Sequence, residues 1–81
     1  MGPISIHFIN RFYHPDISAT SQMLTDLTTG LAGQHKVTVV TSRELYNDPA
    51  ARLNQRDELL GVSIQRLNTT RLGRALVAAG T

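Results

Sequence analysis

Two β-branched segments flank one amphipathic segment in the first half of the chain, and this order constrains the fold more than any other feature. The flanking segments, "ISIHFI" at residues 4–9 and "KVTVVT" at residues 36–41, are rich in Ile, Val and Phe, which is typical of strands. Between them, apolar residues recur at helical spacing over residues 19–32. A strand, a helix and a strand in this order predict a βαβ unit with two parallel strands.

The helix expected at residues 19–32 needs one apolar face to pack on the sheet. Four residues fall on that face at helical spacing: Met23, Leu24, Leu27 and Leu31. Asp26 and the threonines should then face water. Ser18 is a typical N-cap residue, and Gly33 is typical of a helix C-terminus.

A third strand is predicted over residues 62–67, because Val62 and Ile64 alternate with polar residues after Gly61. The polar segment 43–60 is expected to be a surface excursion with a short helical turn at Asp48-Pro49. A last helix is expected in "RLGRALVAAGT". The predicted fold class is therefore α/β: a partial Rossmann-like βαβ-β unit with a three-stranded parallel sheet, in one incomplete domain over residues 1–81.

One complete helix covers only one face of such a sheet, whereas parallel strands need cover on both faces. With 81 residues the chain is also small, and a domain of this size buries only about 60% of its unfolded surface. We expect the chain to be a fragment of a longer protein. The alternative is that it hides the second face by self-association.

Composition excludes several classes of function. The chain has no cysteine, which excludes disulfide scaffolds, thiolate nucleophiles and zinc-thiolate sites. Its eight Lys and Arg residues against six Asp and Glu form no basic run, so nucleic-acid binding is not expected. The first residues lack the pattern of a signal peptide, and no apolar run approaches the length of about 18 residues typical of a membrane span. A cytoplasmic protein is expected.

Ligands of parallel α/β sheets bind beyond the carboxyl ends of the strands, so the three places to look for a ligand are residues 10–20, 41–46 and 68–73. The turn "RFYHPDISATSQ" at residues 11–22 is the first of these. No glycine lies between Gly2 and Gly30. A dinucleotide fingerprint and a Walker A loop both need glycines here, so neither a Rossmann dehydrogenase nor a P-loop enzyme is expected.

A helix N-terminus at this turn offers unpaired N–H groups beside the hydroxyls of Ser18 and Thr20, which suits an anion. The alternative is that these residues only cap the helix and that the Asp16 carboxylate occupies its positive end. His14 is a candidate general base or hydrogen-bond donor, whereas His7 is expected to pack between the sheet and a covering layer. The three histidines show no metal-ligand spacing.

The aromatic residues of the turn, Phe12 and Tyr13, allow two interpretations. They can stack on a sugar or a base, or they can close the core above the first strand, which is the role expected for Phe12.

In order and spacing, these pieces resemble the amino-terminal part of family-4-type glycosyltransferases with the GT-B fold, of the bacterial cell-surface polysaccharide type. The resemblance runs from about Ile4 to Ala75. Its best-matched pieces are Asn10-Arg11-Phe12-Tyr13, Pro15-Asp16-Ile17, Ala19-Thr20-x-Gln22, "VTVVTS" at 37–42, and Gly61-Val62. Many relatives carry glycine in the first turn, where this chain has Ile17-Ser18.

The resemblance implies a parent enzyme with two Rossmann-like domains across a cleft, in which the second domain holds most of the nucleotide-sugar site. This chain would form part of the first, acceptor-side domain, and the carboxy-terminal donor domain would be a missing partner. Seven residues are carried over as substrate-binding: Asp16, Ile17, Ser18, Ala19, Thr20, Arg11 and His14. No catalytic residue, metal ligand or cofactor is assigned to the chain.

The function implied is transfer of a sugar from a nucleotide-sugar donor to a saccharide or lipid-linked acceptor, with the chain inactive alone. A lipid-linked acceptor leaves open a peripheral position at the inner face of the membrane. The alternative function is a small non-enzymatic α/β module that self-associates for assembly or ligand binding.

Overall fold

The computed structural model describes residues 4–80 and consists of one sheet with two helices. The elements along the chain are β1 (Ser5–Ile9), α1 (Ala19–Leu31), β2 (Lys36–Ser42), β3 (Arg56–Leu59), β4 (Val62–Leu67) and α2 (Thr69–Gly80). The chain is therefore α/β, as predicted from the spacing of its apolar segments. Neither helix in this part of the chain has the length and hydropathy needed to span a bilayer.

The sheet has four strands in the order β1-β2-β4-β3, so the prediction of three strands was wrong. β1, β2 and β4 are parallel, as expected, whereas β3 pairs antiparallel with β4 at the sheet edge. β3 lies inside the segment 43–60 that was expected to be a surface excursion. Its sequence, "RDEL", carries no alternation of apolar and polar residues, because an edge strand of this length needs little burial.

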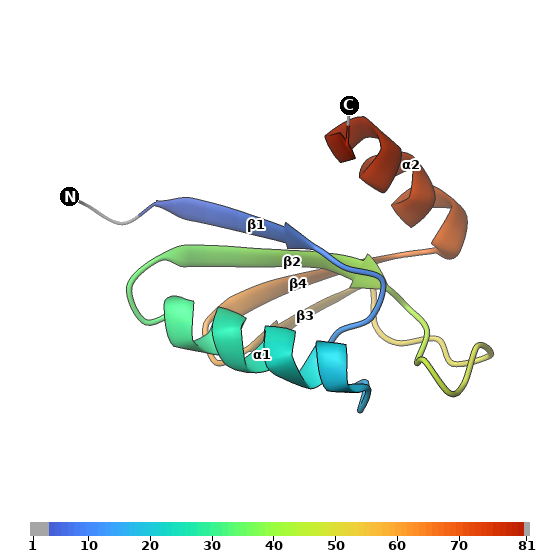
Figure 1. Cartoon of the computed structure of the whole chain (residues 1–81), viewed down its shortest axis with the longest axis horizontal. Helices are drawn as coiled ribbons and strands as arrows, with labels where there is room; N and C mark the ends of the chain where they lie inside the picture. The colour runs from blue at the N-terminus through green and yellow to red at the C-terminus, as the bar shows by residue number, and fades with distance from the viewer. Residues whose placement is uncertain (1–3, 81) are drawn as a thin grey trace.

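The core lies between the sheet and α1. Five buried residues form it: Tyr13, Val37, Val39, Val62 and Ile64. The register places Val37 beside Val62 and Val39 beside Ile64, so these side chains share the face of the sheet that α1 covers. Figure 1 shows α1 along one side of the sheet, whereas α2 rises from the carboxyl end of β4 on the other side.

The buried face of α1 differs from the predicted one. Leu24 and Leu31 pack against the core as expected, but Met23 and Leu27 are 72% and 52% exposed. Thr28 is fully buried instead of facing water. The cause is Tyr13, whose hydroxyl lies 2.7 Å from Thr28 Oγ1 and brings that side of the helix against the sheet.

The second face of the sheet is mainly polar. His7, Ser63 and Gln65 are exposed there, so the expectation that His7 packs against a covering layer was wrong. α2 covers only the carboxyl end of this face, where its Leu72 is buried. α2 begins at Thr69, and the Arg71 N–H donates to Asn68 Oδ1 at 2.8 Å in a side-chain cap.

The loop between β2 and β3 contains a turn rather than the expected short helical turn at Asp48-Pro49. The N–H of Ala51 donates to the carbonyl of Asp48 at 3.1 Å, and Leu45 and Asp48 form an isolated bridge. Tyr46 lies between the bridged residues Leu45 and Asp48, near the carboxyl ends of β1 and β2, so the loop contributes to the candidate site.

Candidate functional site

The turn after β1 is fixed to the end of β2, at the carboxyl edge of the parallel strands. The Arg11 carbonyl accepts hydrogen bonds from the Ser42 N–H at 3.1 Å and from Thr41 Oγ1 at 3.0 Å. Asn10 Nδ2 donates to the Phe12 carbonyl at 2.7 Å, which shapes the next residues. The turn therefore lies where ligands of parallel α/β sheets bind.

Asp16 joins this turn to the β2–β3 loop. Its buried carboxylate accepts the Ser18 N–H at Oδ1, at 2.8 Å, and the Tyr46 N–H at Oδ2. Burial raises the pKa of Asp16, but the hydrogen bonds from Ser18 and Tyr46 outweigh burial and hold the pKa below its ordinary value. Asp16 thus binds the N–H of the residue just before α1, not one of the helix's own N–H groups, and it keeps Tyr46 beside that residue.

The start of α1 is only partly capped. Ser18 occupies the N-cap position as predicted, but its hydroxyl donates to Ser21 Oγ at 2.9 Å rather than accepting a backbone N–H. The N–H groups in the first turn of a helix have no partner within the helix. Among the described residues no side chain accepts from the N–H groups of Ala19 or Thr20, so these donors remain open to a ligand.

Two adjoining cavities lie over this helix start, and together we call them the turn groove. The larger has a volume of about 460 Å³ and is lined by Ile17, Ser18, Ala19, Thr20, Tyr46 and Asn47. The smaller has a volume of about 190 Å³ and is lined by Asn10, Arg11, Phe12, Ser18, Thr20, Ser21 and Tyr46. Ser18, Thr20 and Tyr46 line both, which makes them the centre of the groove.

Aromatic rings form one wall of the turn groove. Tyr46 is 69% exposed and meets Phe12 edge-on, with ring centroids 5.6 Å apart and an interplanar angle of 81°. The Arg11 guanidinium lies over the Phe12 ring, 5.2 Å from its centroid. Phe12 therefore lines the groove, and the expectation that it closes the core was wrong, since Tyr13 has that role.

The structure gathers five of the seven predicted site residues around the turn groove. Ile17, Ser18, Ala19 and Thr20 line the larger cavity, and Arg11 lines the smaller one. Asp16 supports the groove from behind. His14 lines neither cavity: its side chain is exposed, and its carbonyl accepts a hydrogen bond from Arg66 Nη2 at 2.9 Å.

The sequence placed Tyr46 in segment 41–46, one of the three segments expected at the ligand-binding edge, but it singled out neither Tyr46 nor Asn47 as a site residue. Neither follows a strand directly, and their position depends on the long-range bond from Asp16 to the Tyr46 N–H. Beyond that placement, an exposed tyrosine in a polar loop was the only local signal.

The lining of the turn groove combines polar and apolar groups. It offers hydroxyls, two amides, two aromatic rings, the Arg11 guanidinium and the exposed side chain of Ile17. Over residues 4–80, no three His, Asp or Glu side chains gather into a group that suits a metal ion.

No protein-family model, curated protein or solved structure significantly matches the chain.

Proposed function

We propose that the chain forms the acceptor side of a glycosyltransferase of the GT-B type and that the turn groove binds a saccharide. A second Rossmann-like domain, facing this edge of the sheet, would hold the nucleotide-sugar donor. The proposal combines the resemblance of residues 4–75 to such enzymes with the chemistry of the groove.

The observation that carries the proposal is the pairing of Tyr46 with the first turn of α1. Tyr46 and Ile17 are 69% and 71% exposed on the larger cavity, so an apolar surface faces solvent beside the hydroxyls of Ser18 and Thr20. A sugar has apolar C–H faces and a rim of hydroxyls. It can therefore stack on an aromatic ring while it exchanges hydrogen bonds with groups of this kind.

The groove alone does not supply the positioning that catalysis requires. Sugar transfer needs donor and acceptor held in fixed geometry, which is worth several kcal/mol of the barrier. The described lining of the groove has no carboxylate or imidazole to assist the leaving group or the acceptor hydroxyl. We therefore expect no transfer of radiolabelled sugar by the chain alone, and turnover of a nucleotide sugar would contradict this division of roles.

Saturation-transfer-difference NMR tests saccharide binding by the full chain. The probes are methyl glycosides of glucose, galactose, mannose and N-acetylglucosamine. At least one is expected to receive saturation through its C–H protons. Tyr46→Ala should remove most of this transfer, because it removes the stacking surface.

Val77→Ala is the matched control, because Val77 is 69% exposed on α2, on the other side of the sheet. It should leave the transfer unchanged. Equal saturation of the glycosides by Tyr46→Ala and the wild type would contradict the proposal, and so would a lack of transfer to every glycoside.

A further inference from the structure

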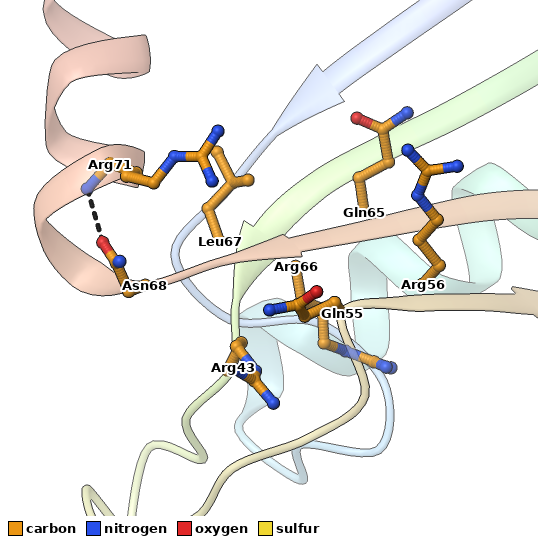
Figure 2. A pocket seen from close by; sticks show the side chains of 8 residues that line it. All are labelled: Arg43, Gln55, Arg56, Gln65, Arg66, Leu67, Asn68 and Arg71. Atoms are coloured by element: carbon orange, nitrogen blue, oxygen red, sulfur yellow. Dashed lines mark hydrogen bonds between the residues drawn. The ribbon is translucent and has the colours of Figure 1, made fainter.

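A cavity separate from the turn groove lies at the carboxyl end of β4, between β3 and the first turn of α2. Several arginines line it. Its volume is about 240 Å³. Figure 2 shows the eight residues around it, four of which are Arg43, Arg56, Arg66 and Arg71. The remaining polar lining is the amide side chains of Gln55, Gln65 and Asn68. We call this the arginine cavity.

Arg56 and Arg71 supply guanidinium groups that are free to bind a ligand. Both are exposed, and Figure 2 shows them on the same side of β4 as Gln65. Arg56 lies directly opposite Gln65 in the β3–β4 pairing, and Arg71 lies in the first turn of α2. Among residues 4–80, neither guanidinium forms a salt bridge or a hydrogen bond.

Arg66 lines the base of the cavity, but its buried side chain leaves β4 on the opposite face from Gln65. Arg66 is only 3% exposed, and its terminal nitrogens donate to the carbonyls of Asn54 and His14 at 3.1 and 2.9 Å. Its one acidic partner, Asp57, lies 3.3 Å away and is half exposed. Arg66 Nε is buried and has no hydrogen-bond partner within the described part of the chain. A buried donor without a partner is costly, and such groups are rare in folded proteins.

Charge in the arginine cavity is therefore unbalanced. The one salt bridge among the described residues joins Asp57 to Arg66 and leaves Arg56 and Arg71 without an acidic partner. Arg43 contributes a further charge, with its Nε bound to the Leu53 carbonyl at 2.8 Å. Planar guanidinium groups bind phosphate oxygens in bidentate pairs, and side-chain amides supply neutral donors beside them.

We propose that the arginine cavity binds the phosphate groups of a small ligand and that a diphosphate suits it best. Free guanidinium groups on two separate segments, β3 and α2, match an anion that carries more than one charged group. Arg56 and Arg71 lie on one side of β4 beside Gln65 instead of following an extended stripe, which favours a small ligand over nucleic acid. This inference does not depend on the glycosyltransferase proposal, since it rests on residues outside the turn groove.

Calorimetric titration of the full chain with inorganic pyrophosphate tests the proposal. We expect saturable binding at one site, with inorganic phosphate weaker by about tenfold. Arg56→Gln and Arg71→Gln should each weaken pyrophosphate binding by about tenfold or more, the loss typical of one charge-assisted hydrogen-bonded pair.

Arg74→Gln is the matched control, because it removes the same charge three residues further along α2 without touching the cavity. It should change pyrophosphate affinity by less than about twofold. Circular-dichroism melts show whether each variant is folded. Titration of the wild type with pyrophosphate should also shift the amide NMR signals of Gln65, Asn68 and Arg71. This measurement locates the bound anion without any variant.

Several outcomes would overturn the proposal. Equal weakening by Arg74→Gln would indicate attraction to net charge rather than to the cavity. Equal affinity for citrate would remove the preference for phosphate. Binding to a single-stranded oligonucleotide or to phosphatidylglycerol vesicles without binding of pyrophosphate would assign the arginines to a different partner. An adventitious, unsaturable response to pyrophosphate would leave no site.

Discussion

Asp16 determines the geometry of the turn groove more than any other residue, because it joins two loops that are distant in sequence. Its carboxylate holds the start of α1 through Ser18 and the β2–β3 loop through Tyr46. These bonds hold the Tyr46 backbone where its ring meets Phe12. Asp16 is thus a positioning residue for the groove.

Asp16→Asn is expected to lower the free energy of unfolding by about 1.5–3 kcal/mol at pH 7, the value typical of hydrogen bonds to a charged group. The folded-state pKa lies below the ordinary value of 3.8, so the stabilisation is complete above pH 3.8 and is lost as pH falls through the lower folded value. Urea unfolding at pH 7 and at pH 3 measures both effects. The difference between Asp16→Asn and wild type should shrink at pH 3, whereas exposed Asp26→Asn should change little at either pH. A pH-independent difference would contradict this account.

Tyr13 and Thr28 form the buried hydrogen bond that sets the orientation of α1. Thr28 has one hydroxyl hydrogen, and its Oγ1 donates to the Leu24 carbonyl at 2.8 Å, so the Tyr13 hydroxyl donates to Thr28. Thr28→Val would leave this donor buried without an acceptor and should cost about 1–3 kcal/mol.

Tyr13→Phe removes the donor itself and should cost less, about 0.5–1.5 kcal/mol. Thermal unfolding of both variants gives the comparison. A larger loss for Tyr13→Phe than for Thr28→Val would contradict the assigned direction of the bond.

At the scale of elements, the β3–β4 hairpin is the part that sequence reasoning did not find. Leu60 and Gly61 form its two-residue turn, with φ of 47° and 89°. Positive φ at both positions is typical of a type I′ turn, for which Asn-Gly or Asp-Gly is the usual sequence. Leucine is uncommon at the first position because its Cβ crowds the backbone there.

Leu60→Asn should therefore stabilise the chain by about 0.5–1 kcal/mol, since Asn tolerates this conformation and Leu60 is already 79% exposed. Gly61→Ala should destabilise it by about 1–2 kcal/mol, because φ at Gly61 is 89° and an added Cβ would lie 3.4 Å from the Ala32 Cβ. Denaturant midpoints of the two variants should move in opposite directions. A lower midpoint for Leu60→Asn would show that Leu60 does not adopt this turn.

The elements that could be predicted are those whose pattern is local. β1, β2, β4 and α1 match the expected ranges 4–9, 36–41, 62–67 and 19–32 to within one residue, because each carries a strong apolar period. The buried face of α1 could not be predicted, since it depends on the distant Tyr13 hydroxyl. β3 has neither an alternating pattern nor a usual turn sequence beside it.

The candidate site divides in the same way. Position after a strand predicts a ligand at residues 10–20 and 41–46, and the resemblance singles out Ile17 to Thr20 within the first segment. Nothing local predicts that Asp16 holds Tyr46 at the groove. The arginines showed no basic run in the sequence. Sheet pairing brings Arg56 beside β4, and the start of α2 brings Arg71, so the arginine cavity exists only in the fold.

For the whole molecule, the two faces of the sheet differ in a way that bears on self-association. The face that α1 covers is apolar and buried, whereas the other exposes His7, Ser63 and Gln65. Stable homodimer interfaces bury apolar surface at their centre. The polar face therefore gives no support to the alternative of a module that dimerises through its sheet.

Sedimentation velocity tests this at micromolar concentrations. We expect a monomer, because the uncovered face of the sheet is polar. Ser63→Glu, which adds a charge at the centre of that face, should leave the sedimentation coefficient unchanged. A dimer that Ser63→Glu dissociates would contradict the expectation and favour the self-associating module.

Location of the bound sugar by NMR tests the proposed function most directly. In ¹H–¹⁵N spectra of the full chain, a methyl glycoside that binds should shift the amides of Ile17 to Thr20, Tyr46 and Asn47, which line the larger cavity. Asp16→Asn should abolish these shifts by releasing Tyr46. Shifts confined to other parts of the chain, or no shifts with any glycoside, would contradict the proposal that the turn groove is the acceptor site.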